Sequence, residues 1–148
     1  MTCTVFFDTC QSKNTVTLSN CKVEEGRSSF MISASAPVDF KKVKFDDCSC
    51  PNSKPLEKRC DWIIDSLSNK TLYFIELKGA DIVKALVQLE NSVKIVKPQK
   101  KFECHIVKSS GAGGIPGFNT KFQNIQAKFA KINGKIYPAH SRTHTINI

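Results

Sequence analysis

Three residues, Asp61, Glu76 and Lys78, have the types and the spacing that metal-assisted chemistry requires. One residue separates Glu76 from Lys78, and alternate residues of a strand point to the same face of a sheet. Asp61 precedes Glu76 by 15 positions, a separation that a β-hairpin can close. The pattern therefore predicts two carboxylates beside one ammonium group at the end of a pair of strands.

Such a group suits phosphodiester hydrolysis, because two neighbouring carboxylates repel each other unless a cation lies between them. Oxygen ligands favour Mg²⁺, which commonly takes one or two carboxylates together with waters and phosphate oxygens; we expect Mn²⁺ to substitute for it. We expect Asp61, Glu76 and the main-chain carbonyl of Leu77 to hold the ion, which would activate a water. Lys78 can orient that water or stabilise the charge that develops on the phosphate.

The segments Cys60-Asp-Trp-Ile-Ile and Tyr-Phe-Ile-Glu-Leu-Lys-Gly79 resemble the PD-(D/E)XK nuclease superfamily, which has the restriction-endonuclease-like fold. The signature of that family is an Asp that opens one strand and a Glu-x-Lys on the paired strand. Its core is a mixed sheet flanked by helices, in the order α-β-β-β-α-β. The resemblance covers residues 57–107 and implies a Mg²⁺-dependent endonuclease that acts on DNA.

The resemblance also implies roles outside the hairpin. Many members carry a Gln on the helix after the hairpin, and Gln88 occupies that place, where it would assist catalysis. Members often have an acidic residue before the first core strand that completes the metal shell. Glu57 is the nearest candidate, and Glu24 and Glu25 are alternatives further upstream. Small nucleases of this fold commonly dimerise, which implies a homodimer.

Other interpretations of the same residues stay open. Glu76 and Lys78 fit an ordinary cross-strand pair, Asp65 is an alternative to Asp61, and Gln88 fits an ordinary polar position on a helix. A catalytically inactive nuclease fold that binds nucleic acid or protein, or an RNA-directed nuclease, would use the same chain.

The central part of the sequence predicts the elements that must position these residues. Cys60–Asp65 and Thr71–Leu77 are apolar runs joined by a polar segment, which predicts a hairpin in the centre of a sheet. Apolar residues then recur with helical spacing over Asp81–Ile95, and Asp81 suits a helix cap. Phe102–Val107 is a further expected strand.

The two ends of the chain complete the expected fold. Residues 1–50 read as strands, with runs at Thr4–Phe7, Thr15–Leu18, Phe30–Ala34 and Val38–Phe45. A second amphipathic helix is expected from Phe122 to Ile132 with Gly134 as its stop, and Thr145–Ile148 as a last strand. We expect one α/β (α+β) domain over residues 1–148, with a central mixed sheet flanked by helices and a β-rich N-terminal part.

The charge balance indicates a polyanionic partner. The 148 residues include 22 Lys and Arg against 13 Asp and Glu, a net charge of +9. We expect nucleic acid, DNA foremost, to be contacted by basic and polar residues of the C-terminal half, namely Lys97, Lys100, Lys101, Lys108 and Ser109. No apolar run is long enough to span a bilayer, and Met1–Asp8 lacks a secretory pattern, so a cytoplasmic location without a membrane partner is expected.

The seven cysteines and three histidines do not show the spacing of a metal-binding motif. An odd number of cysteines argues against a disulfide framework, so reduced, partly buried thiols are expected. His140 and His144 are four residues apart, but the tail around them favours strands over a helix. We therefore expect no metal site among the histidines.

Overall fold

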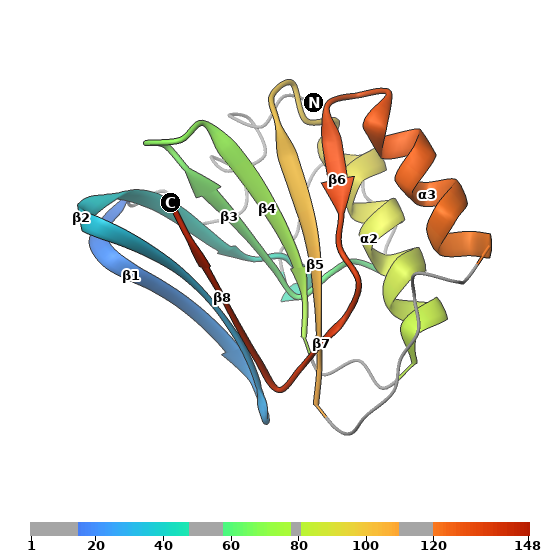
Figure 1. The fold of residues 1–148 in the computed structure, drawn as a ribbon, viewed down its shortest axis with the longest axis horizontal. Helices are drawn as coiled ribbons and strands as arrows, with labels where there is room; N and C mark the ends of the chain where they lie inside the picture. Colours follow the sequence, from blue (N-terminus) through green and yellow to red (C-terminus); the bar gives the residue numbers. More distant parts are fainter. Residues whose placement is uncertain (1–14, 48–57, 78–80, 110–119) are drawn as a thin grey trace.

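The computed structural model describes residues 15–47, 58–77, 81–109 and 120–148, and every structural statement below concerns these residues. Their elements follow one another along the chain as shown in Figure 1. They are β1 (Val16–Glu25), β2 (Ser28–Lys44), the 3₁₀ helix η1 (Phe45–Asp47), β3 (Trp62–Ser66), β4 (Thr71–Glu76), α2 (Ile82–Val96), β5 (Phe102–Lys108), α3 (Thr120–Ala130), β6 (Gly134–Ile136), β7 (His140–Ser141) and β8 (Thr143–Asn147).

The strands of the described residues form one mixed sheet in the order β1-β2-β3-β4-β5-β6, with β8 beside β2 and β7 beside β5. β2, β3 and β4 pair antiparallel, whereas β5 runs parallel to β4. The parallel pair needs a crossover connection, and α2 supplies it. The mixed α+β class and the order strand, strand, helix, strand after Asp61 are thereby confirmed.

β2 is a long strand that belongs to two parts of the sheet. Its first half, from Ser29 to Ser33, pairs with β8, and its second half, from Phe40 to Lys44, pairs with β3. The sequence predicted two strands here, and the structure has one, with Pro37 near a register shift of the β1–β2 pair. The sheet curls as a result, with β1, β2 and β8 turned away from the helices (Figure 1).

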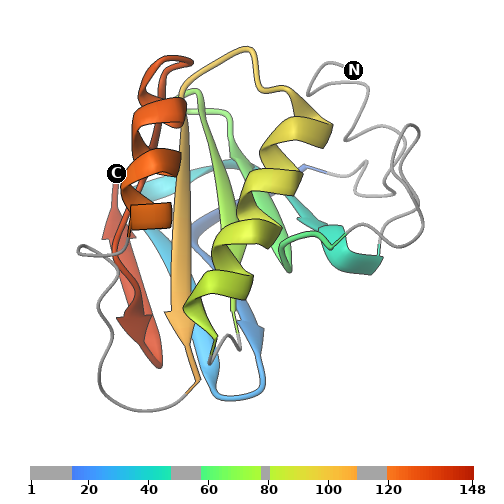
Figure 2. The same cartoon turned by 90° about the vertical axis from the view of Figure 1, so that its right-hand side faces the viewer.

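Both faces of the central strands are covered. Figure 2 shows α2 and α3 lying across one face. Leu72 and Phe74 of β4 belong to the apolar cluster under these helices. Tyr73, Ile75 and Leu77 belong to a second cluster, which fills the inside of the curl. This alternation explains why the sequence of β4 is an almost continuous apolar run.

The two helices differ in how well their ends were predicted. α2 begins after Asp81, whose side chain accepts a 3.1 Å hydrogen bond from the backbone N–H of Lys84, and this confirms the expected cap. α3 ends at Ala130, earlier than predicted, and Ile132 is 51% exposed instead of lying on the buried stripe. No helix of the described residues is long and apolar enough to cross a membrane.

Gly134 is the first residue of β6 and does not act as the helix stop that the sequence predicted. The chain turns at Asn133, which has a φ of 66°. A Cβ atom at position 134 would overlap the ring of Phe102. Glycine is therefore required at this position because the backbone passes directly beside an aromatic ring.

Candidate functional site

Asp61 and Glu76 meet at the end of the central β3–β4 pair. The register pairs Trp62 with Ile75, so the adjoining residues Asp61 and Glu76 lie opposite each other. The backbone N–H of Asp61 donates a 3.2 Å hydrogen bond to Oε1 of Glu76. The backbone N–H of Leu77 donates a 2.7 Å hydrogen bond to Oδ2 of Asp61. Two side chains that are 15 positions apart in sequence are thus held together by the main chain.

Both acids are buried, with 2% of Asp61 and 3% of Glu76 exposed. A buried carboxylate is costly unless hydrogen bonds or a cation compensate it. The two main-chain N–H donors supply part of that compensation and fix the direction of each carboxylate. The pair is therefore a rigid, desolvated acidic centre on the helix-covered face, at the end of the sheet.

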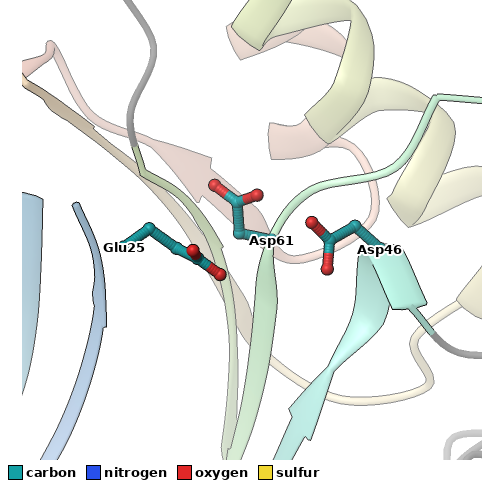
Figure 3. A group of neighbouring side chains, drawn as sticks. All are labelled: Glu25, Asp46 and Asp61. Carbon is teal, nitrogen blue, oxygen red and sulfur yellow. The ribbon is translucent and has the colours of Figure 1, made fainter.

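Two further acids approach Asp61, as Figure 3 shows. Glu25 is the last residue of β1, and Asp46 lies in η1, immediately after β2. The carboxylates of Glu25, Asp46 and Asp61 each have an oxygen within 4.8 Å of the other two. The curl of β2 brings this about, because it places the β1–β2 turn next to the chain that leads from β2 toward β3.

One lysine pairs with this acidic group, and one oxygen of the group is buried without a hydrogen-bond partner in the described part of the chain. Nζ of Lys44 lies 3.2 Å from Oε1 of Glu25, and the Lys44 side chain is 41% exposed. Oδ1 of Asp46 is shielded from solvent and has no hydrogen-bond partner in the described part of the chain. Every potential ligand in the group is a carboxylate oxygen, which is the donor that Mg²⁺ and Mn²⁺ prefer. The residues present fit such an ion.

Of the predicted site residues, Lys78 and Glu57 lie outside the described residues. The Leu77 side chain is fully buried inside the curl, as expected from strand alternation. Asp65, the alternative to Asp61, lies toward the other end of β3, where it pairs with Leu72 and forms an ion pair with Lys100. Only Asp61 of these two acids is beside Glu76.

Gln88 holds the segment that leads into Asp61. Its Nε2 donates a 3.3 Å hydrogen bond to the main-chain carbonyl of Arg59. One turn further along α2, Oγ of Ser92 accepts a 2.8 Å hydrogen bond from the N–H of Cys60. Sequence reasoning missed Ser92, although its spacing of four from Gln88 places it on the same helix face. Both side chains position the chain next to Asp61.

The predicted nucleic-acid contacts divide between the two ends of the sheet. Glu76 pairs with Ile106 in the parallel β4–β5 ladder, so Lys108 and Ser109 continue toward the same end as the acids. The remaining three predicted contacts lie at the opposite end of the sheet, near the start of β5, and are Lys97, Lys100 and Lys101. At that end, the backbone N–H of Leu72 in β4 donates a hydrogen bond to the main-chain carbonyl of Lys101. The structure does not bring these three lysines to the acidic centre.

The described cysteines are buried free thiols, namely Cys21, Cys60 and Cys104. Burial raises the pKa of Cys21 to about 11, with Lys42 opposing the rise. Burial likewise raises the pKa of Cys60 and of Cys104. Such thiols are neutral near pH 7 and pack as small apolar side chains.

No protein family, curated protein or solved structure matches this chain.

Proposed function

We propose that this chain is a Mg²⁺-dependent endonuclease that hydrolyses phosphodiester bonds in DNA. The observation that carries the proposal is the buried Asp61–Glu76 pair at the end of two central strands, with the oxygens of Glu25 and Asp46 gathered at Asp61. The order of strands and helix around that pair supports the restriction-endonuclease-like fold as the finer description. In this proposal, one acidic metal ligand, Glu25, comes from the β1–β2 hairpin, which distinguishes the chain from members of the superfamily whose additional acid directly precedes the first core strand.

The metal shell of the proposal consists of carboxylate oxygens and one main-chain oxygen. Asp61, Glu76 and the carbonyl of Leu77 are its core, and Glu25 and Asp46 are the additional acids because each has an oxygen within 4.8 Å of an oxygen of Asp61. When bound, the ion would supply Lewis acidity and lower the pKa of a bound water. Lys44 neutralises part of the acidic group and is exposed enough to turn outward when an ion binds.

The residues of the chain itself would bind and orient the substrate. Ser109 lies at the acidic end of the sheet, where it is suited to hold a phosphate of the backbone, and Lys108 beside it is only 6% exposed and would contribute mainly its charge. In the proposal, Lys78 serves the attacking water, as its position two residues after Glu76 suggests. The net charge of +9 supports a polyanionic substrate that is held through its phosphates.

A cleavage assay with matched variants tests the proposal. Supercoiled plasmid, single-stranded DNA and RNA are incubated with wild type, Asp61→Asn, Glu76→Gln and Asp65→Asn in Mg²⁺ or Mn²⁺. We expect the wild type to cleave the plasmid. The cleavage rate of Asp61→Asn and Glu76→Gln should fall by more than the roughly 10–100-fold that loss of an outer-shell partner of a metal ligand costs. Asp65→Asn removes the same charge four residues further along, within β3, and should cleave like wild type. Equal activity in all four proteins would contradict the assignment, and cleavage of RNA alone would redirect it to an RNA nuclease.

A second candidate is a catalytically inactive nuclease-like module that binds nucleic acid. It is favoured by the hydrogen bonds from the main chain, because one oxygen each of Asp61 and Glu76 already accepts such a bond. Calorimetric titration with Mn²⁺ separates the two candidates. A nuclease should take up Mn²⁺ and lose it in Glu76→Gln, whereas a binding module should bind DNA in a salt-dependent manner and take up no metal at this site.

A further inference from the structure

A cavity of about 510 Å³ lies inside the curl, on the face of the sheet opposite the helices. It is bordered by β8 on one side and by β4 and β5 on the other. Its lining includes Tyr73, Glu103, His105, Tyr137, His140 and His144. All three histidines of the chain therefore meet in one cavity, although their spacing in sequence predicted no common site.

The topology explains this meeting. β7 pairs with the end of β5, which puts His140 beside Val107. β8 pairs with the first half of β2, which puts His144 beside Phe30. The ring of Phe30 lies 4.9 Å from His105 and 5.9 Å from His144, centroid to centroid. The curl of the sheet thus brings β5, β7 and β8 around the same cavity.

His105 at the floor of the cavity has one nitrogen satisfied and the other without a partner. Its Nε2 lies 3.0 Å from Oε1 of Glu103. Its Nδ1 is shielded from solvent and has no hydrogen-bond partner in the described part of the chain, and the residue is only 1% exposed. If Nε2 donates to the carboxylate, Nδ1 carries a buried lone pair, which is costly to leave unpaired. An imidazole held by a carboxylate through one nitrogen is the usual arrangement of a metal-binding histidine.

His140 and His144 are available beside it as neutral imidazoles. Burial, followed by the neighbouring histidines, lowers the pKa of His144 to about 4, and burial and His105 lower that of His140. The His105 and His144 rings are 5.6 Å apart. Two imidazoles on one tetrahedral ion at a metal–nitrogen distance of about 2.0–2.1 Å have centres about 5–6 Å apart. The His105–His144 spacing is therefore compatible with a shared ion.

We propose that His105, His140 and His144 form a binding site for a divalent transition metal ion, with Zn²⁺ as the reference case and Glu103 orienting His105. Imidazole nitrogens select Zn²⁺, Co²⁺, Ni²⁺ or Cu²⁺ over Mg²⁺, so the site differs in chemistry and in place from the acidic group. It does not depend on the proposed nuclease function.

Binding requires one local rearrangement. The rings of His140 and His144 are stacked with their centroids 3.5 Å apart and their planes within 6°, so their nitrogen lone pairs lie in nearly parallel planes and do not converge on one ion. Among the described residues, only Glu25, Asp46 and Asp61 already have their donor atoms within 4.8 Å of one another. His140 and His144 are half-buried on short strands, so side-chain rotation can unstack them and turn both toward His105.

Cobalt titration of the full-length, reduced and chelator-treated protein tests the site. Co²⁺ reports its coordination in the visible spectrum, and thiolate ligands add a charge-transfer band that separates them from imidazoles. In excess Mg²⁺, which saturates carboxylate sites but competes poorly for imidazoles, we expect one Co²⁺ per chain without that band, displaced by Zn²⁺. His144→Phe and His140→Phe should each weaken binding at least about tenfold, and Glu103→Gln roughly 10–100-fold. Tyr137→Phe, which keeps the ring stacked on His105, is the matched control and should bind like wild type.

Circular dichroism of each variant shows whether it has folded, and because His140 and His144 are only half-buried, loss of the fold is a lesser concern there than at His105. A cobalt affinity that is unchanged in both His→Phe variants would overturn the proposal. So would a thiolate band in the wild-type complex, or the absence of any stoichiometric uptake of Co²⁺ or Zn²⁺.

Discussion

The backbone N–H of Leu77 donates a 2.7 Å hydrogen bond to Oδ2 of Asp61, which ties the end of β4 to the start of β3. The side chain of Leu77 anchors the same residue in the cluster inside the curl. The apolar core thus holds Leu77 in place, and the backbone N–H of Leu77 in turn fixes the direction of the Asp61 carboxylate. A site residue held in this way contributes to stability as well as to chemistry.

The first prediction separates these two contributions. Asp61→Asn retains an acceptor for the N–H of Leu77 and removes the charge, whereas Asp61→Ala leaves a buried donor unpaired. We expect Asp61→Ala to lower the free energy of unfolding by about 1–3 kcal/mol and Asp61→Asn to lower it by less. Urea denaturation monitored by circular dichroism measures both. Equal losses in the two variants would show that the hydrogen bond does not stabilise the fold.

The second prediction concerns which glutamate joins the acidic group. Glu25→Gln and Glu24→Gln change adjacent residues by the same charge, but only Glu25 has an oxygen near Asp46 and Asp61. Glu24 is exposed, and its Oε2 lies 3.4 Å from Nζ of Lys22. We expect Glu25→Gln to weaken Mn²⁺ binding at least about tenfold, because it replaces a negatively charged carboxylate ligand by a neutral amide. Glu24→Gln should leave the calorimetric titration unchanged, and a reversed order would place the ligand at Glu24.

The sequence predicted the parts of this site that depend on local periodicity. The apolar runs on both sides of Asp61 and Glu76 predicted the hairpin, and strand alternation predicted that Leu77 points into the core. Helical spacing and Asp81 predicted α2 within one residue at each end. These features follow from patterns of two or 3.6 residues, which neighbouring residues alone determine.

The parts that the sequence did not predict depend on tertiary approach. The sequence offers Glu24, Glu25 and Glu57 as alternative upstream acids, and the curl of β2 brings an oxygen of Glu25 near Asp61. The sequence does not single out Asp46 or Ser92, because no local pattern distinguishes a carboxylate or hydroxyl that meets Asp61 or Cys60 only through folding. The gathering of His105, His140 and His144 requires the pairing of β7 with β5 and of β8 with β2, which is parallel and distant in sequence.

The third prediction tests the close approach at Gly134. Gly134→Ala introduces a Cβ that overlaps the ring of Phe102, so the ring or β6 must move. We expect a loss of about 1–3 kcal/mol in the free energy of unfolding, as is typical for overpacking. Phe102→Leu should be destabilising alone but should relieve the clash, so the double variant should lose less than the two single losses combined. Strict additivity would mean that the two residues do not interfere with each other.

The fourth prediction is a pH dependence of stability that arises at His144. In the folded chain, burial and the charges of His140 and His105 lower the pKa of His144 to about 4 from the ordinary value of 6.5. Between these values, the unfolded chain binds a proton that the folded chain does not, so the free energy of unfolding falls as the pH falls. The contribution of His144 is complete above about pH 6.5 and is lost as the pH drops toward 4. His140, whose pKa is also lowered, acts in the same direction.

Thermal unfolding from pH 8 to pH 4 in a chelating buffer measures this effect. The other titratable side chains of the cavity stay in place in His144→Phe, and they are Tyr73, Lys101, Glu103, His105, Tyr137 and His140. That variant keeps an aromatic ring against Phe30 but cannot be protonated. We expect its melting temperature to fall less steeply than that of wild type over the window from pH 6.5 to pH 4, with no difference in slope above pH 7. Because His144 is half-exposed, the loss of stability on acidification that His144→Phe removes is smaller than it would be for a fully buried histidine. Parallel curves for the two proteins throughout the range would mean that protonation of His144 does not oppose folding.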